Sequence, residues 1–305
     1  MNFNCIAVVG SSNTDMVIKT SKLPVPGETI LGGNFFMNPG GKGANQAVAA
    51  ARLGGKVSFI AKIGDDVFGN QARNLFESEN INTKYLVTDP GHPSGVALIT
   101  VDERGENCIV VAPGSNRYLI KSDIDLACEE ILKSDIVLMQ LEIPIETVIY
   151  VANIAFDAGK KVILNPAPAF QITDDLLSKL YLITPNETEA ELISGIPVID
   201  FDSATLAARN LYERGVKVVI ITLGSKGALL FTGKEAKLIT SPKVEAVDTT
   251  AAGDVFNGAI AVAISKGMEL EKAVEFACNA AAISVTRMGA QASAPYLKEI
   301  NTINR

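Results

Sequence analysis

One short run, Asp248-Thr249-Thr250-Ala251-Ala252-Gly253-Asp254, combines small residues with a carboxylate in a way that suits chemistry on an anion. The apolar stretch 255–264 predicts a buried helix that ends near Gly267, so its first turn falls at 251–254. Free N–H groups and the positive end of the helix dipole make that turn a seat for a phosphate. The dipole should also keep Asp254 ionised, as a base toward an attacking hydroxyl must be. The run therefore indicates phosphoryl transfer, and simple capping of the helix by Asp254 is the alternative.

A second glycine-rich stretch, Asn38-Pro39-Gly40-Gly41-Lys42-Gly43-Ala44-Asn45-Gln46, opens the helix expected over 44–53. Its three glycines let a polar ligand approach the main chain, and Asn45 offers both a donor and an acceptor. The stretch is not a Walker A loop, because Gly43 stands where Ser or Thr should follow the lysine. It is not a dinucleotide fingerprint either, because Gln46 replaces the last glycine. On its own this loop is weak evidence for a site.

Composition narrows the class of protein. The chain has 305 residues, 48% of them hydrophobic, which is enough for one large α/β domain or for one domain with a smaller appendage. A net charge of −7 favours neither nucleic acid nor anionic lipid as a partner. The four cysteines show no CxxC spacing, so we expect no zinc site and a reducing compartment. Without a signal-peptide pattern or a long apolar stretch, we expect a cytoplasmic protein with no membrane contact.

His92 is the single histidine and stands in a turn rich in proline and glycine. A single histidine cannot build a multi-histidine metal site, and one placed in such a turn carries no partner pattern for Ser-His-Asp catalysis, so both are almost excluded. We interpret His92 as a solvated loop residue.

Alternating β-branched and helical segments predict a doubly wound, mostly parallel sheet with helices on both faces. The expected strands are 5–9, 57–63, 136–140, 162–165, 181–184 and 218–222, and the expected helices are 44–53, 66–80, 145–158, 187–194 and 203–214. Two stretches, 16–36 and 95–111, break this rhythm with short strands and turns. Because hairpin segments without helices cannot join a doubly wound sheet, we expect them to form a separate small sheet.

Polar side chains follow several of the expected strands. Asn13 and Asp15 come after the first strand, and Glu142 follows the strand at 136–140. Because sites in an open parallel sheet gather at the carboxyl ends of its strands, we expect these residues at one edge. An Asn with an Asp two positions later can hold adjacent sugar hydroxyls, although an Asx turn explains the pair equally well.

Two further segments have both a functional and an ordinary interpretation. Asn186 and Glu189 begin the helix at 187–194, where they could hold the water shell of Mg²⁺ or simply start the helix. The stretch 222–227 is a strand end that runs into a glycine turn. Spacing alone favours a hairpin turn there, leading into the apolar residues 228–231.

Taken together, these motifs resemble the ribokinase family of carbohydrate kinases. The resemblance covers nearly the whole chain, and any one of its motifs alone would be inconclusive. The matching stretches are residues 10–15, 26–29, 40–47, 140–142, 165–169, 184–189, 222–224, 248–254 and 289–291.

The resemblance implies a ribokinase-like three-layer α/β fold over 1–305, with a small β-sheet lid from 14–40 and 94–112 that also makes a homodimer contact. It implies ATP-dependent phosphorylation of D-ribose at its 5-hydroxyl to ribose 5-phosphate, with Asp254 as general base and with Mg²⁺ and K⁺ as cofactors. The alternative is a kinase for another sugar or nucleoside: deoxyribose, fructose, ketodeoxygluconate or adenosine. A sugar-binding regulator without catalysis is a second alternative, which the retained Asp254 and both glycine clusters argue against.

Specific residues take roles only through this resemblance. The sugar site is assigned to Asn13, Asp15, Gly40, Gly41, Lys42, Gly43, Asn45, Glu142 and Asp254, and catalysis to Asp254 with the anion hole at Ala251, Ala252 and Gly253. The nucleotide and its magnesium are assigned to Asn186, Glu189, Thr222, Leu223, Gly224, Ser225, Lys226, Gly227, Gly253, Asp254, Cys278 and Asn279. At the adenine slot this chain has Cys278 where a polar residue is usual. The potassium positions are Asp248, Thr250, Ser284, Arg287, Gly289 and Ser293, with Arg287 expected to fix the loop instead of binding the ion.

Overall fold

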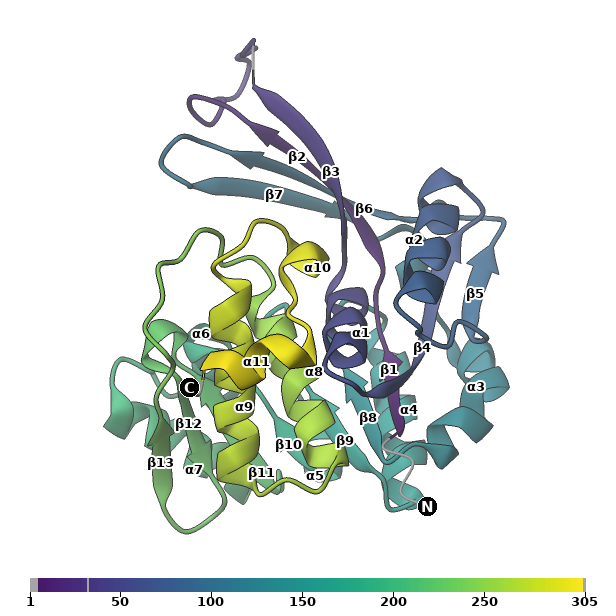
Figure 1. Ribbon diagram of the computed structural model, residues 1–305. Helices are drawn as coiled ribbons and strands as arrows, with labels where there is room; N and C mark the ends of the chain where they lie inside the picture. Colours follow the sequence, from purple (N-terminus) through teal and green to yellow (C-terminus); the bar gives the residue numbers. More distant parts are fainter. Residues whose placement is uncertain (1–4, 32, 304–305) are drawn as a thin grey trace.

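The computed structural model describes residues 5–31 and 33–303, and two sheets dominate this part of the chain (Figure 1). In spatial order, the described strands of the large sheet are β13 (Ala236–Ile239), β12 (Ala228–Phe231), β11 (Val218–Thr222), β10 (Leu182–Ile183), β9 (Lys161–Leu164), β8 (Ile136–Met139), β1 (Cys5–Val9), β4 (Lys56–Gly64) and β5 (Leu86–Asp89). Neighbours from β5 to β11 pair in parallel, whereas β12 and β13 are added antiparallel. The expected mostly parallel sheet is therefore confirmed.

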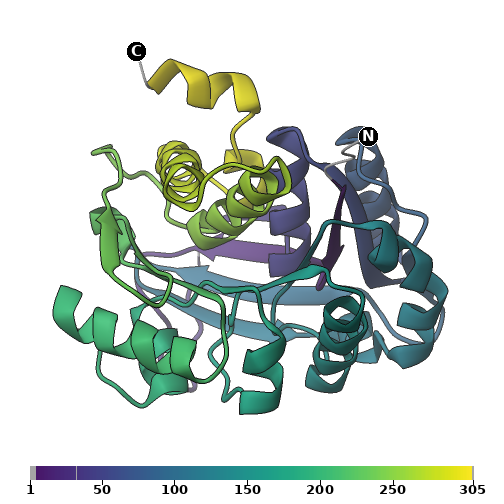
Figure 2. The ribbon, with the colours of Figure 1, turned by 90° about the horizontal axis from the view of Figure 1, so that it is seen from below.

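Helices cover both faces of the large sheet, so the core has three layers (Figure 2). One face packs against α1 (Lys42–Arg52), α2 (Val67–Ser78), α8 (Ala252–Ser265), α9 (Leu270–Ser284) and α11 (Leu297–Ile303). The other face packs against α3 (Lys121–Lys133), α4 (Ile145–Asp157), α5 (Asp174–Lys179), α6 (Glu187–Ser194) and α7 (Phe201–Glu213). The predicted doubly wound fold is confirmed.

The central strand β1 shows why the sequence folds this way. Its side chains from Ile6 to Val9 are fully buried, and they alternate between the two cores. Ile6 and Val8 contribute to the core under α1 and α8, and Ala7 contributes to the opposite one. A strand that is apolar on both sides is typical of a parallel sheet covered by helices.

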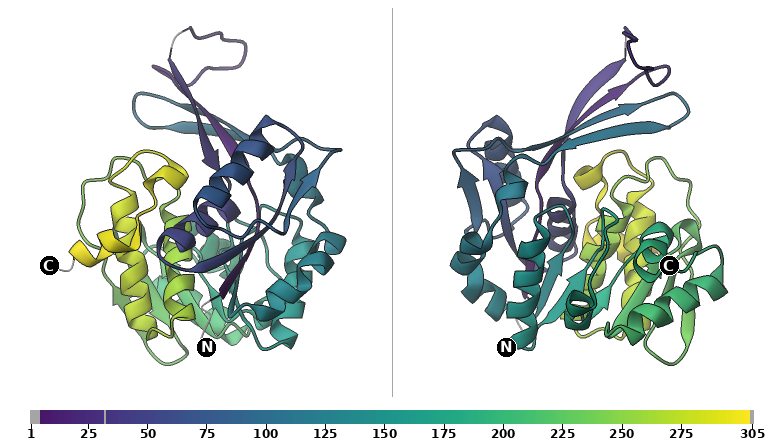
Figure 3. Two further views of the ribbon diagram at one scale, coloured as in Figure 1. Left: turned by 45° about the vertical axis from the view of Figure 1, so that its right-hand side comes forward. Right: turned by 180° about the vertical axis from the view of Figure 1, so that it is seen from behind.

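A second, smaller sheet projects beyond the edge at which β1 leads into β2 (Figure 3). Its described strands, in spatial order, are β3 (Asn34–Gly40), β2 (Asn13–Lys19), β6 (Gly95–Val101) and β7 (Asn107–Ala112). The central pair, β2 and β6, is parallel, so the sheet consists of two antiparallel pairs, β2–β3 and β6–β7, joined through one parallel pairing. It occupies the predicted lid segments 14–40 and 94–112, of which residue 32 lies outside the described residues.

Several elements differ from the prediction. Strands β5 and β13 and helices α3, α5 and α11 are not among the predicted elements, and β10 is only two residues long. Residues 241–249 belong to no described helix or strand, and a turn at Thr250 leads into α8. Among the described helices, none has the length and apolar character that crossing a membrane would require.

Candidate functional site

Helix α8 begins where the small-residue run predicts, at Ala252. Its N-cap residue, Ala251, has φ +60°, a left-handed conformation that non-glycine residues seldom adopt, and no side chain caps the helix. The alternative that Asp254 merely caps the helix is therefore wrong. The Ala252 N–H donates to the Thr249 carbonyl across 3.3 Å, which leaves Gly253 and Asp254 as the better donors for an anion. A Cβ built on Gly253 would meet nothing within 4 Å, so a ligand can reach this turn.

The carboxylate of Asp254 turns inward instead and receives a hydrogen bond at each oxygen. Asn45 Nδ2 donates to Oδ2 across 2.9 Å, and Gln46 Nε2 donates to Oδ1 across 2.9 Å. Burial raises the pKa of Asp254 above its ordinary range, while the charge of Lys42 and these two amides oppose that rise. Burial is the main influence on the pKa of Asp254, so the expectation that the helix dipole determines its ionisation is wrong. A raised pKa suits a base better, because it strengthens the attraction for a proton.

Glu142 and Lys42 meet next to this carboxylate. Glu142 Oε2 accepts from the Ser11 hydroxyl and, across 2.9 Å, from the backbone N–H of Lys42. Burial alone would lower the pKa of Lys42, but Asp254, Glu142 and two further carboxylates raise it above its usual range. The site therefore holds one ammonium among several carboxylates.

Asp15 and Asn13 lie at the base of the small sheet, where β2 pairs with β3 and β6. Burial, together with the negative charges of Glu142 and Asp254, raises the pKa of Asp15 to about 6. Asn13 Oδ1 accepts a hydrogen bond from Asn116 Nδ2 across 2.8 Å. Asn116 also binds both backbone polar groups of Ser12, so it positions this turn. The sequence offers no recognisable pattern that would have identified Asn116.

The glycines of the second cluster serve the fold more than a ligand. A Cβ on Gly40 would lie 2.2 Å from Asp15 Oδ2, and one on Gly43 would lie 2.5 Å from the backbone nitrogen of Ser11. Gly41 has φ +89° and faces the backbone of the β1–β2 turn. The prediction that these glycines open space for a ligand is wrong in detail, because the protein itself fills that space. They let α1 begin directly against the turn after β1.

A cavity of about 780 Å³ extends from Asp254 over the start of α8. Many of the predicted nucleotide residues line it: Asn186, Glu189, Thr222, Gly224, Ser225, Gly227, Gly253, Asp254 and Cys278. Leu223, Lys226 and Asn279 are not among its lining residues. The prediction missed Asn165, Thr184, Asn257 and the segment 241–244, which also line it. Asn165 and Thr184 each begin a stretch that matches the family, whereas the segment 241–244 has no sequence signal.

The loop after β11 satisfies both interpretations offered for it. It is a tight turn, because β11 and β12 pair antiparallel on either side of it. Gly224 has φ +56°, and a Cβ there would meet nothing within 4 Å, so its outer side is open to the cavity. A hairpin turn and a nucleotide loop are compatible descriptions.

Asn186 and Glu189 form a reciprocal capping box at the start of α6. Asn186 Oδ1 accepts from the Glu189 N–H across 2.8 Å, and Glu189 Oε2 accepts from the Asn186 N–H across 2.9 Å. The ordinary helix-start interpretation is therefore correct for these contacts. Glu189 is nevertheless buried at the cavity wall, and burial raises its pKa despite the nearby Lys42.

Cys278 lies on α9 at the far wall of the cavity. Burial raises the pKa of its thiol to about 12, so the group is neutral at physiological pH. It contributes an apolar surface, not a nucleophile or an anion.

Two of the predicted potassium residues, Thr250 and Gly289, bond to the carboxylate of a third, Asp248. Its Oδ1 accepts from the Thr250 N–H across 2.9 Å, and its Oδ2 accepts from the Gly289 N–H across 2.8 Å. The Ser284 carbonyl accepts from the Arg287 N–H, and the Ser293 hydroxyl donates to the Ala290 carbonyl. The guanidinium of Arg287 turns away to an ion pair with Glu299. An all-oxygen set of one carboxylate, hydroxyls and carbonyls fits a weakly held cation.

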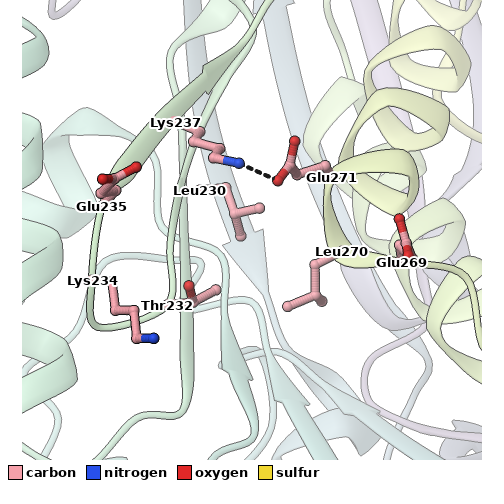
Figure 4. Close-up of a pocket in the computed structure, with 8 residues that line it drawn as sticks. All are labelled: Leu230, Thr232, Lys234, Glu235, Lys237, Glu269, Leu270 and Glu271. Carbon is pink, nitrogen blue, oxygen red and sulfur yellow. Dashed lines mark hydrogen bonds and ion pairs between the residues drawn. The ribbon is translucent and has the colours of Figure 1, made fainter.

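A second hollow lies between β12, β13 and the start of α9 (Figure 4). Its wall mixes lysines and glutamates, and Lys237 is paired with Glu271. None of the predicted site residues lines it.

Comparison with known proteins identifies the family. The family model described as pfkB family carbohydrate kinase matches residues 4–297. Ribokinase of Haemophilus influenzae is 45% identical over 294 residues, which are 96% of each chain. Deoxyribokinase of Salmonella typhi is 41% identical over 298 residues, which are 97% of each chain. The structure of Arabidopsis thaliana ribokinase complexed with ribose and ATP matches with a TM-score of 0.91 and 34% identity, over 98% of this chain and 97% of that one. The resemblance seen in the sequence is confirmed, and this chain belongs to the pfkB family of carbohydrate kinases.

Proposed function

We propose that this protein transfers the γ-phosphoryl group of ATP to the 5-hydroxyl of D-ribose and releases ribose 5-phosphate and ADP. The observation that carries the proposal is the position of Asp254. Its backbone belongs to the open first turn of α8, and its carboxylate is bonded to Asn45 at the start of α1. One residue thus touches both the phosphate seat and the polar cluster suited to a sugar.

The sugar is proposed to lie against Asn13, Asp15 and Asn45. Asn45 Oδ1 is buried and has no hydrogen-bond partner among the described residues, so it is an acceptor prepared for a hydroxyl donor. Asp15 and Glu142 supply further acceptors, and the ammonium of Lys42 offsets their charge. Gly40, Gly41 and Gly43 contribute by holding α1 against the β1–β2 turn.

Asp254 is proposed to take the proton of the attacking 5-hydroxyl. Of the predicted anion-hole positions Ala251, Ala252 and Gly253, the N–H of Gly253, together with that of Asp254, would hold the negative oxygens of the transferred group. Lys42 lines the same cavity, so its positive charge lies near both the base and the phosphates. Positioning and charge stabilisation supply most of the rate in phosphoryl transfer, and these groups supply both.

The nucleotide is proposed to occupy the 780 Å³ cavity, with its phosphates toward Gly253 and Gly224 and its base toward Cys278. The open surfaces of both glycines fit a phosphate chain. Mg²⁺ bound with ATP would neutralise phosphate charge, and Glu189 with Asn186 would hold its water shell. K⁺ would be held by Asp248, Thr250, Ser284, Gly289 and Ser293, next to the turn that carries the anion seat. The use of ATP also agrees with a cytoplasmic location.

A homodimer through the small sheet is part of the proposal. Because Met16 lies opposite Met37 and Leu98, and Leu98 lies opposite Val110, all four share one face. By alternation Asp15 lies on the other face, toward the site. Met37, Leu98 and Val110 are about half exposed or more, and such an apolar sheet face is suited to a second copy.

Coupled measurement of ADP release with ribose, 2-deoxyribose, fructose and adenosine tests the substrate. The Salmonella relative makes deoxyribose the main competitor. Ribose should give the highest kcat/KM, because each buried acceptor at Asp15 and Asn45 is left unpaired when a sugar hydroxyl is missing. If kcat/KM with 2-deoxyribose were equal to or higher than that with ribose, ribose would not be the preferred substrate, and the family assignment would still hold.

A further inference from the structure

Gln46, one residue beyond the expected sugar ligand Asn45, is fully buried on α1. Its Nε2 donates to Asp254 Oδ1 across 2.9 Å and to Asn165 Oδ1 across 3.1 Å. Its Oε1 accepts from Gln140 Nε2 across 2.6 Å. Gln140 is also fully buried, at the end of β8.

The surrounding bonds allow only one orientation of the Gln46 amide. Asn165 Nδ2 donates to the Thr184 carbonyl, so Asn165 presents its oxygen to Gln46. If the Gln46 amide were reversed, its oxygen would face the oxygens of Asp254 and Asn165, and its nitrogen would face the nitrogen of Gln140. The chain of donors therefore runs from Gln140 through Gln46 to the Asp254 carboxylate.

The two oxygens of Asp254 are consequently not equivalent. Oδ1 accepts from Gln46, whose other side-chain bonds are to the buried amides of Asn165 and Gln140. Oδ2 is bonded to Asn45, which stands at the expected sugar site and whose own Oδ1 has no partner in the described part of the chain. Oδ2 is thus the oxygen that faces the place from which a hydroxyl would arrive.

We propose that Gln46, held by Gln140, is a positioning residue that fixes the Asp254 carboxylate so that Oδ2 accepts the proton of the attacking hydroxyl. Gln46 would bind neither sugar nor nucleotide, since its three polar contacts are all within the protein. This inference rests on the proposed role of Asp254 as base.

Several other charged groups around Asp254 also influence its pKa. Lys42 is the nearby cation, and Glu142, Asp15 and Glu189 are the nearby carboxylates. Gln46 adds one donated bond to Asp254 Oδ1 without adding charge. Its loss should therefore raise the pKa of Asp254 without altering the net charge of the site.

The test compares Gln46→Leu with the wild-type enzyme across pH. Wild-type ADP formation with ribose is measured first and decides the substrate by itself; the variants are then compared on whichever sugar the wild type phosphorylates. We expect kcat at pH 7 to fall about tenfold to a hundredfold, part of the full worth of a general base. KM for both substrates should change less than about threefold, and the acid limb of kcat should move up by roughly one pH unit.

Gln140→Leu and Asn210→Leu complete the series. Gln140→Leu removes the bond that holds Gln46 but leaves its donor, so we expect a smaller change in the same direction. Asn210 lies on α7 with a buried oxygen that has no hydrogen-bond partner within residues 5–31 and 33–303, so Asn210→Leu is a matched control that should leave kcat unchanged. Circular dichroism verifies that each variant is folded. If Gln46→Leu does not fold, the kcat and acid limb of Gln140→Leu decide whether Gln46 positions the Asp254 carboxylate.

Titration of ¹³C-labelled aspartate by NMR gives a readout that does not depend on turnover. The Asp254 carboxyl should titrate at higher pH in Gln46→Leu than in the wild type. An unchanged acid limb together with an unchanged Asp254 titration would overturn the inference, as would a loss seen only in KM. A wild-type protein that phosphorylates none of the sugars would instead contradict the proposed function. The NMR titration would still decide whether Gln46 acts on Asp254.

Discussion

The side-chain amide of Asn45 donates to Oδ2 of Asp254 across 2.9 Å and so joins the first turn of α1 to the first turn of α8. The two residues are 209 positions apart in the sequence. Through this contact the polar cluster after β1 and the small-residue turn before α8 become one site. A hydroxyl bound by the first can therefore be presented to a phosphate bound by the second.

Replacing Asp15 with Asn should weaken the binding of ribose much more than that of ATP. A carboxylate that accepts from sugar hydroxyls in a buried site is worth about 1–3 kcal/mol, which corresponds to a rise in ribose KM of roughly fivefold to a hundredfold. Steady-state kinetics with each substrate varied will measure this. Asp202→Asn, at an exposed position on α7, is the control. A similar rise in both KM values would mean that Asp15 supports the fold and not the sugar.

The pKa of Asp15 also predicts how stability changes with pH. The folded protein holds this proton with a pKa of about 6, against an ordinary value of 3.8. Between those two values the folded state binds more protons than the unfolded state, so the free energy of unfolding falls as pH rises through this window. Asp15→Asn should remove this fall in the free energy of unfolding. At pH 7 the variant should therefore be more stable than the wild type by about 2–3 kcal/mol. Denaturant unfolding at pH 4 and pH 7 measures it, and an equal difference at both would contradict the assignment.

Potassium should raise turnover at saturating ribose and ATP when it replaces sodium. Asp248 holds the loops on both sides of the proposed cation through Thr250 and Gly289, and this cluster immediately precedes the first turn of α8. A bound ion there would fix the geometry and charge of the anion seat. Titration of K⁺ against a sodium background measures the response, which should weaken in Asp248→Ala. Equal activity in potassium-free sodium would remove the cation site and leave the kinase assignment in place.

Introducing a charge into the apolar face of the small sheet should separate the proposed dimer. Leu98 is 55% exposed at the centre of that face, so Leu98→Lys would bury an unpaired ammonium between two copies. Light scattering after size-exclusion chromatography should give twice the chain mass of 32.2 kDa for the wild type and the single mass for the variant. Leu126→Lys, a similarly exposed leucine on α3, is the matched control and should stay dimeric. A wild-type protein that is monomeric at micromolar concentration would end this part of the proposal.

The sequence predicts the large sheet and the start of α8 because both depend on local signals. Strand β1 is a continuous apolar run, and α8 is bounded by small residues before Val255 and by Gly267 with φ +74°. The small sheet is predicted to exist, but the parallel pairing of β2 with β6 is not, since it depends on contacts between segments about eighty residues apart.

The site is predicted less completely, for a physical reason. Gln46 enters the sequence argument as a mismatch to a dinucleotide fingerprint and as part of the matching stretch 40–47, with no role of its own, although it bonds Asp254 from 208 positions away. Asn116 likewise acts through long-range bonds to Ser12 and Asn13. The pKa of Asp254 is governed by burial, which the local helix-dipole argument does not contain. Effects that arise from packing between distant segments remain invisible until those segments are folded together.

The central claim is that Asp254 is the base, and Asp254→Asn tests it most directly. The amide keeps the size of the side chain but cannot accept the proton, so turnover should fall about a hundredfold to ten-thousandfold. Calorimetric titration with ribose and with a non-hydrolysable ATP analogue should show affinities within a few-fold of the wild type. Turnover near the wild-type rate in the folded Asp254→Asn variant would contradict the account.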